Sequence, residues 1–189
     1  MSSVAVLGAG SFGTTLAIHL ANAGHDARLW GRDAAAMAQL GGARENTKFL
    51  AGIHLPPEVK VHAELEAALE GAQFHLFVVP SQAMRSVAAQ VAATGASGIP
   101  VCASKGLELG TLRRLSEVLV ETLGDPAPVT LTGPSHAEEV ARGSRPPWSR
   151  QASTANARAR CRCCARPRGF GCTRTTTSSA ASTVARSRT

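Results

Sequence analysis

The sequence predicts an α/β fold of the doubly wound type, in which a mostly parallel sheet has helices on both faces. The first indication is that short apolar runs alternate with segments of helical periodicity from the N-terminus to about Gly143. The second is the stretch V-A-V-L-G-A-G-S-F-G at Val4–Gly13, where an apolar run enters a glycine-rich turn that opens a helical segment. Repeats of strand, helix and strand build parallel sheets, because a parallel pair needs a crossover connection.

Six short runs have the composition of strands in such a sheet. They are largely apolar on both faces, as strands covered by helices on both sides are, and glycine, proline or a polar residue lies at or just after the end of each. In chain order we expect strands at Val4–Gly8, Ala27–Trp30, near Val59–Val61 (the weakest of the six), His75–Val79, Ile99–Ala103 and Val129–Thr132.

Six segments between and after these runs have helical patterns. Apolar residues recur in them every three or four positions, which gives each helix a face to bury against the sheet. In chain order we expect helices at Ser11–Ala23, Ala34–Leu40, Ala63–Leu69, Met84–Ala93, Thr111–Leu123 and Ser135–Ala141. Ser135 and Glu138 have the spacing of a capping box at the start of the last of these helices.

The three glycines of the first turn, Gly8, Gly10 and Gly13, follow the G-x-G-x-x-G pattern of dinucleotide-binding turns. We expect Gly8 to allow the tight exit from the strand and Gly10 to let the backbone approach a pyrophosphate. Gly13 would let the helix pack closely on the strand. The helix directs its free amides and the positive end of its dipole at that phosphate. The sequence therefore predicts a Rossmann-type site for NAD or NADP.

Polar or glycine-rich segments also follow four of the other five expected strands, namely W-G-R-D, V-P-S-Q, S-K-G-L-E and T-G-P-S. Since ligands of an open α/β sheet bind outside the carboxyl ends of its strands, we expect these segments to border one crevice. Arg32 follows the second strand, near the place where an NAD-specific protein has an acidic residue on the ribose. A guanidinium there can pair with a 2′-phosphate, which favours NADP. Neighbouring Asp33 can still serve the ribose, and Arg32 can equally be a solvated surface charge.

The net charge of +7 comes from one end of the chain. Residues 144–189 contain ten Arg and no Lys, Asp or Glu, whereas residues 1–143 carry ten basic and 13 acidic side chains. Both periodicities stop at Gly143, so we expect one domain over 1–143 and a disordered tail over 144–189. Four of the five cysteines lie in this tail at a spacing that fits no common zinc site, and we expect no metal.

The sequence also bears on the compartment. No apolar run is long enough to span a membrane, and the N-terminus lacks the pattern of a signal peptide. We therefore expect a cytoplasmic protein with no membrane partner.

Several motifs together resemble those of the bacterial-type NAD(P)-dependent sn-glycerol-3-phosphate dehydrogenases. They occur in that family's order and spacing as G-A-G-S-F-G-T-T-L-A at Gly8–Ala17, W-G-R-D at Trp30–Asp33, E-N-x-x-F-L-x-G-I-x-L-P at Glu45–Pro56, V-P-S-Q-A-M-R at Val79–Arg85, S-K-G-L-E at Ser104–Glu108 and T-G-P-S-H-A-E-E-V at Thr132–Val140. The resemblance implies a Rossmann domain followed by an all-helical C-terminal domain, often in a homodimer. It implies reversible hydride transfer between sn-glycerol 3-phosphate and dihydroxyacetone phosphate for phospholipid synthesis, with no nucleic acid as partner.

The resemblance also implies cofactor contacts. Ser11 and Phe12 would lie beside the pyrophosphate, and Ala137 would lie close to the cofactor. Phe12 can equally be a residue of the core.

Substrate contacts are implied in the same way. Lys105 would hydrogen-bond substrate oxygens and reach the nicotinamide region, unless it is a solvated lysine. Gly133 and Ser135 would bind the substrate through backbone and hydroxyl, although Ser135 can also serve simply as a helix cap. The family's general-base lysine lies in a V-E-L-G-G-x-L-K-N motif of the helical domain, which this sequence does not contain. We therefore expect the 189 residues to bind cofactor weakly and to turn over little or nothing.

The tail has the pattern of a shifted reading frame. After Gly143 the family continues with something like L-P-T-A-V-V-x-A-S, whereas this chain reads S-R-P-P-W-S-R-Q-A-S. Restoring one nucleotide at the Gly143 codon permits L-P-T-A-V-V-A-A-S and, further on in the same frame, F-R-V-Y-T-N-D-D-V-V. We expect a single-base deletion, in the gene or in its sequencing, that replaces the helical domain by residues 144–189.

Two alternatives remain open at this point. One is another two-domain dehydrogenase, of the hydroxyacyl-CoA or ketopantoate type, although S-K-G-L-E and G-P-S-H-A argue against it. The other is a Rossmann nucleotide-binding module whose Arg-rich tail binds nucleic acid. Against this second alternative, Trp148 and Phe170 are the only aromatic residues in the tail.

Overall fold

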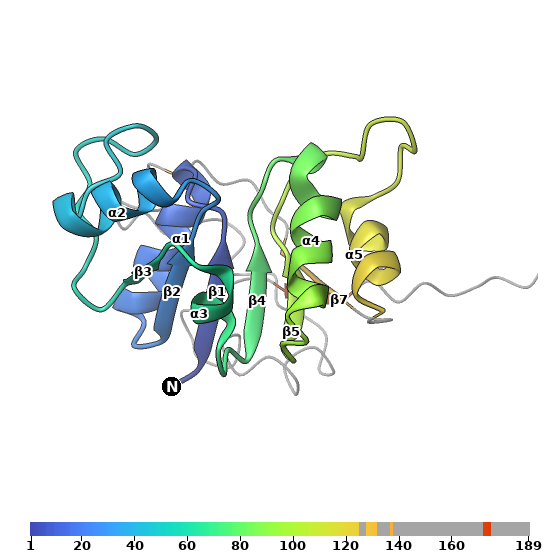
Figure 1. The fold of residues 1–189 in the computed structure, drawn as a ribbon, viewed down its shortest axis with the longest axis horizontal. Coiled ribbons are helices and arrows are strands. Elements are labelled where there is room, and N and C mark those ends of the chain that lie inside the picture. The colour runs from blue at the N-terminus through green and yellow to red at the C-terminus, as the bar shows by residue number, and fades with distance from the viewer. Residues whose placement is uncertain (125–127, 132–136, 138–171, 175–189) are drawn as a thin grey trace, which may run out of the picture.

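The computed structural model describes residues 1–124, 128–131, 137 and 172–174, and its centre is one sheet (Figure 1). Six parallel strands follow the spatial order β3-β2-β1-β4-β5-β6. Their bounds are Ser3–Leu7 (β1), Asp26–Trp30 (β2), Lys60–His62 (β3), Phe74–Phe77 (β4), Ile99–Cys102 (β5) and Val129–Leu131 (β6). The strand order reverses between β1 and β4, which is the topological switch point of a doubly wound sheet.

Helices cover both faces of this sheet (Figure 1). They are α1 (Ser11–Asn22), α2 (Ala34–Ala43), α3 (Leu65–Leu69), the 3-10 turn η1 (Ser81–Ala83), α4 (Met84–Ala93) and α5 (Leu115–Leu123). Strand β1 separates two apolar cores, because successive side chains of a strand point to opposite faces. Val4 and Val6 belong to the core with α1 and α2, and Ala5 and Leu7 belong to the core with α3, α4 and α5.

The predicted doubly wound sheet with helices on both faces is confirmed, and its six parallel strands lie within two residues of their expected bounds. Two helices begin later than expected, α3 by two residues and α5 by four. Thr111–Arg114 precedes α5 as irregular chain, with Leu112 at a left-handed φ of 56° and Arg114 as the extended cap residue. The apolar spacing of this stretch was compatible with a helix, but a β-bridge between Leu107 and Arg114 holds its backbone.

The remaining predicted elements lie near or beyond the limits of the described residues. Of the helix expected over Ser135–Ala141, Ala137 is described and is helical. Within the tail that was expected to lack regular structure, Cys172–Arg174 forms strand β7, which pairs antiparallel with β6 at the sheet edge. None of the helices in the described part of the chain is long and apolar enough to cross a membrane.

Candidate functional site

The turn from Gly8 to Gly13 joins β1 to α1 at the carboxyl ends of the parallel strands, beside the switch point between β1 and β4. Gly8 has a φ of 126°, and a Cβ at this position would stand 2.3 Å from the carbonyl oxygen of Val78. The Gly8 amide donates to the carbonyl of Trp30 at 2.8 Å. A Cβ on Gly13 would stand 1.8 Å from the carbonyl oxygen of Gly8. Both positions exclude a side chain, because neighbouring backbone occupies the space.

Gly10 differs from the other two glycines. It has an ordinary extended backbone, with φ −77° and ψ −178°, and no described atom lies within 4 Å of a Cβ built on it. The first hydrogen bond of α1 runs from the Thr14 amide to the Gly10 carbonyl at 2.9 Å, so the amides of residues 11–13 precede the helical ladder. Open space above a helix start with such amides is the geometry that binds a pyrophosphate. Ser11 and Phe12 are half-buried there, and Phe12 also packs against the core beneath α1.

A buried amide side chain supports this turn from the β2–β3 connection. Asn46 is 8% exposed, and its Nδ2 donates to the Ala9 carbonyl at 2.9 Å and to Thr14 Oγ1 at 2.8 Å. Its Oδ1 accepts from the Phe49 amide at 3.3 Å. Asn46 is thus bonded to both ends of the glycine turn. Sequence reasoning assigned it no function, although the E-N-x-x-F-L motif that contains it was recognised.

The first turn of α1 also contacts the segment that follows β6. Thr15 is fully buried, and its Oγ1 lies 2.9 Å from the Ser11 carbonyl and 3.1 Å from the Ala137 carbonyl. This contact places Ala137 beside the helix start that carries Ser11 and Phe12. The other residues predicted in that segment, Gly133 and Ser135, lie outside the described residues.

Arg32 and Asp33 follow β2 at the same edge of the sheet. Arg32 is exposed. Asp33 is the N-cap of α2, and its Oδ1 accepts from the Ala36 amide at 3.0 Å. A carboxylate that caps a helix has one oxygen engaged with backbone, so Asp33 has a structural task besides any contact with a ribose.

Lys105 lies beyond β5, in the loop that leads to α5. Its side chain is exposed, and its Nζ stands 5.8 Å from the centroid of the Phe12 ring, within the range of a cation–π contact. Ser104, just before it, accepts from the Val79 amide at 2.9 Å and donates to the Phe77 carbonyl at 3.2 Å. The structure thereby brings the S-K-G motif to the first turn of α1. Arg32, by contrast, forms no hydrogen bond, ion pair or ring contact with Lys105 or Phe12 in the described part of the chain.

Cys102 ends β5 next to this loop. The side chain is buried, and burial raises the pKa of its thiol to about 11. A thiol with such a pKa is a poor nucleophile at neutral pH. In the described part of the chain, no cluster of three or more His, Cys, Asp or Glu side chains could hold a metal ion.

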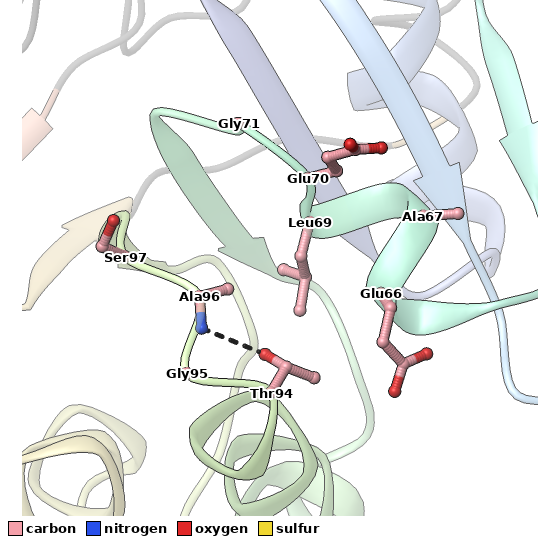
Figure 2. Close-up of a pocket in the computed structure, with 9 residues that line it drawn as sticks. All are labelled: Glu66, Ala67, Leu69, Glu70, Gly71, Thr94, Gly95, Ala96 and Ser97. Carbon is pink, nitrogen blue, oxygen red and sulfur yellow. Dashed lines mark hydrogen bonds between the residues drawn. The ribbon is translucent and has the colours of Figure 1, made fainter.

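A separate pocket of about 500 Å³ lies at the amino ends of β4 and β5, opposite the ends that carry the glycine turn (Figure 2). It is lined by residues 66–71, from α3 and the α3–β4 connection, on one side and by residues 94–97, between α4 and β5, on the other. Both connections precede their strands. The pocket is therefore remote from the glycine turn, which follows a strand.

Comparison with known proteins identifies the family of this chain. The family model for the N-terminus of NAD-dependent glycerol-3-phosphate dehydrogenase matches residues 3–151. The chain belongs to this family. The predicted resemblance is confirmed.

Individual members of the glycerol-3-phosphate dehydrogenase family agree with that assignment. The NAD(P)+ glycerol-3-phosphate dehydrogenase of Geobacillus kaustophilus is 46% identical over 143 residues, which are 74% of this chain and 42% of that protein. The enzyme of Thioalkalivibrio sulfidiphilus is also 46% identical, over 142 residues that are 43% of its length. The crystal structure of the Coxiella burnetii enzyme matches with a TM-score of 0.69 and 36% identity, over 74% of this chain and 43% of that one. The chain thus spans less than half the length of the relatives it matches.

Proposed function

We propose that this chain carries the cofactor-binding part of an NAD(P)-dependent glycerol-3-phosphate dehydrogenase. The reaction is reversible hydride transfer between sn-glycerol 3-phosphate and dihydroxyacetone phosphate, which supplies glycerophospholipid synthesis in the cytoplasm. The observation that carries the proposal is the approach of Lys105 to Phe12 beside the open turn at Gly10. This arrangement joins a charged substrate-binding group to a helix start suited to a pyrophosphate.

The residues present fit a nicotinamide dinucleotide. Gly10 leaves free the space that the pyrophosphate needs, and the amides of residues 11–13 are available to it. When bound, the nicotinamide ring accepts or supplies the hydride. Ser11, Phe12 and Gly13 line the helix start, Gly8 forms the exit from β1, and Ala137 lies beside them.

Lys105 supplies positive charge for the substrate. Its ammonium can donate up to three hydrogen bonds, to the carbonyl or hydroxyl oxygen and to phosphate oxygens of a triose phosphate. Its anchored neighbour Ser104 fixes where the loop leaves β5. Gly133 and Ser135 are proposed to bind the same substrate.

Arg32 is proposed to favour NADP over NAD. Its exposed guanidinium follows β2 and can pair bidentately with a 2′-phosphate. Asp33 is engaged as the cap of α2, which reduces its freedom to hold ribose hydroxyls.

We further propose that efficient turnover needs more than these 189 residues. The relatives are more than twice as long as the part that matches, and the general-base motif of the family does not occur in this sequence. The reading-frame hypothesis for residues 144–189 has its own test, because resequencing the DNA would find the missing base near the Gly143 codon. We also propose that the protein with its helical domain forms a homodimer, and that it binds neither nucleic acid nor membrane.

The deciding assay follows NADPH oxidation with dihydroxyacetone phosphate, together with NADPH binding by fluorescence. The 189-residue chain is compared with a version whose reading frame is restored after Gly143. We expect weak NADPH binding by the first and turnover by the second alone. Turnover by the 189-residue chain would place the catalytic machinery elsewhere, and salt-dependent DNA binding lost on deletion of 144–189 would favour a nucleic-acid-binding module instead.

A further inference from the structure

The loop that carries Lys105 has little regular structure of its own. Figure 1 shows it as an arch from the carboxyl end of β5 to the start of α5. Lys105, Gly106 and Leu107 are exposed, and Gly106 has a φ of 103°. An exposed segment of this kind keeps a defined position only if neighbouring elements hold it.

The side chain of Gln82 holds this loop through its backbone. Gln82 lies in η1, at the start of α4, and its Nε2 donates to the Leu107 carbonyl at 3.4 Å. Its Oε1 accepts from the Leu109 amide at 3.2 Å. One amide side chain therefore bonds the loop on both sides of Glu108.

Arg85, in the first turn of α4, holds Glu108 itself. Its Nε lies 2.8 Å from Glu108 Oε1 and its Nη2 lies 3.0 Å from Glu108 Oε2, which is a bidentate pair. Arg85 Nη2 also donates to Glu121 of α5 at 3.0 Å, and Thr111 Oγ1 donates to Glu108 Oε2 at 2.6 Å.

The Glu108 side chain is 13% exposed. Its pKa is lowered to about 2, chiefly by the hydrogen bonds from Arg85, so it stays ionised throughout the neutral range. Both members of the Arg85–Glu108 pair are therefore charged at neutral pH. Two motifs that had no function assigned, V-P-S-Q-A-M-R and the end of S-K-G-L-E, thus meet at one contact.

We propose that Gln82 and Arg85 are positioning residues for Lys105. By fixing the loop three residues downstream of the lysine, while Ser104 fixes it one residue upstream, they hold the ammonium at the Phe12 ring. Among the described residues, neither Gln82 nor Arg85 forms a hydrogen bond or ion pair with the glycine turn at residues 8–13. The proposal rests on the proposed function of Lys105 in substrate binding, which the test below examines separately.

The experiment uses the 189-residue chain, which contains three lysines, Lys48, Lys60 and Lys105. Reductive methylation with ¹³C-formaldehyde labels these amines, retains their charge and gives a few well-separated NMR signals. Lys105→Arg assigns its signal. Phe12→Leu measures how much of the displacement of that signal comes from the ring.

We expect Arg85→Ala and Glu108→Gln each to lose most of the Phe12-dependent displacement of the Lys105 signal. The double variant should add little to either, because the two side chains act as one pair. Arg85→Lys, which keeps one charged bond, should retain part of the displacement. Arg114→Ala is the matched control, since Arg114 pairs with Glu117 and not with Glu108, and it should leave the signal in place.

The signal of Lys60, whose Nζ lies 2.8 Å from Asp26 Oδ1 across the β3–β2 strand pair, reports whether each variant is folded. If Arg85→Ala does not fold, Gln82→Ala decides the question with the same readout. An unchanged Lys105 signal in folded Arg85→Ala and Gln82→Ala would overturn the proposal.

Titration with NADPH and then dihydroxyacetone phosphate tests the function of Lys105. Displacement of the Lys105 signal in the parent chain by the triose phosphate, and its loss in Arg85→Ala, is the expected result. No response in the parent would contradict the proposed function of Lys105. The positioning by Gln82 and Arg85 would still be decided by the spectra without ligand.

Discussion

Gly13 and Gly10 of the glycine turn should respond in opposite ways to substitution by alanine. Gly13→Ala places a methyl group 1.8 Å from the carbonyl oxygen of Gly8, whereas Gly10→Ala places it where no described atom lies within 4 Å. Ordinary contacts of a Cβ begin near 3.4 Å. The methyl of Gly13→Ala must therefore push α1 from β1 by more than an ångström.

The obstacle at Gly13 is backbone, so no side-chain rotation relieves it. Overpacking a core costs about 1–3 kcal/mol, and we expect Gly13→Ala to lie at the upper end, near 3 kcal/mol. A loss of that size lowers Tm by roughly 6–12 °C in a domain of this length. For Gly10→Ala the backbone angles are accessible to alanine, and the cost is that of a poorer N-cap residue, about 1 kcal/mol or less.

For NADPH binding, we expect Gly10→Ala to have a large effect although it changes stability little. The methyl of Gly10→Ala occupies the approach to the pyrophosphate, so we expect NADPH binding to be lost while near-ultraviolet circular dichroism and Tm stay close to the parent. Thermal unfolding and NADPH fluorescence titration of the two variants measure both effects. A folded Gly10→Ala chain that binds NADPH like the parent would refute the assignment of this turn to the pyrophosphate, and a Gly13→Ala chain as stable as the parent would refute the steric reasoning.

Three further predictions concern the cofactor phosphate, the support of the turn and pH. Arg32→Ala should weaken NADPH binding by about 1.5–3 kcal/mol, a tenfold or greater loss, with NADH binding unchanged, and equal losses for the two cofactors would exclude a 2′-phosphate contact. Asn46→Ala should cost about 1–3 kcal/mol in urea unfolding, because the Ala9 carbonyl and Thr14 hydroxyl lose their partner, and should weaken NADPH binding as the turn loosens. Burial lowers the pKa of the His75 imidazole below its usual 6.5, so the unfolded chain takes up this proton at a higher pH than the folded chain. The contribution of His75 to stability is therefore complete above pH 6.5 and declines as the pH falls below it. We expect His75→Leu to flatten the resulting decline in Tm between pH 7 and pH 5.5. An unaltered slope would assign the decline to His19 or His62, whose pKa values burial also lowers.

The parts of this protein that could be predicted from its sequence depend on local patterns. The β1 strand, the glycine turn and α1 are specified by residues within about twenty positions of one another, and their bounds in the structure differ from the expected ones by one residue. A mostly parallel sheet was predicted, but the spatial order of its strands, β3-β2-β1-β4-β5-β6, was not.

The contacts that escaped prediction connect residues far apart in the chain. Asn46 reaches Ala9 across 37 residues, and Arg85 reaches Glu108 across 23. Sequence periodicity does not predict such a bond, because an Asn or Arg that forms it has the same local sequence pattern as one that is exposed to solvent. The late start of α5 has a local cause that was also hidden, since leucine at position 112 occupies a left-handed conformation that its residue type rarely adopts.

The contact between Gly8 and the Val78 carbonyl has a consequence for when the chain can first bind a cofactor during its synthesis. The glycine turn is among the first parts made, yet the Val78 carbonyl that confines it comes 70 residues later, and the Val78 amide bonds the Leu7 carbonyl at 2.9 Å. At a translation rate of about 5–20 residues per second, roughly 4–14 seconds separate the two. During that interval β1 lacks its partner β4, and the turn lacks one of its sides. A ribosome-bound chain that exposes residues up to His75 should therefore fail to retain NADPH, whereas one that exposes residues through Ala103 has both neighbours of β1 in place.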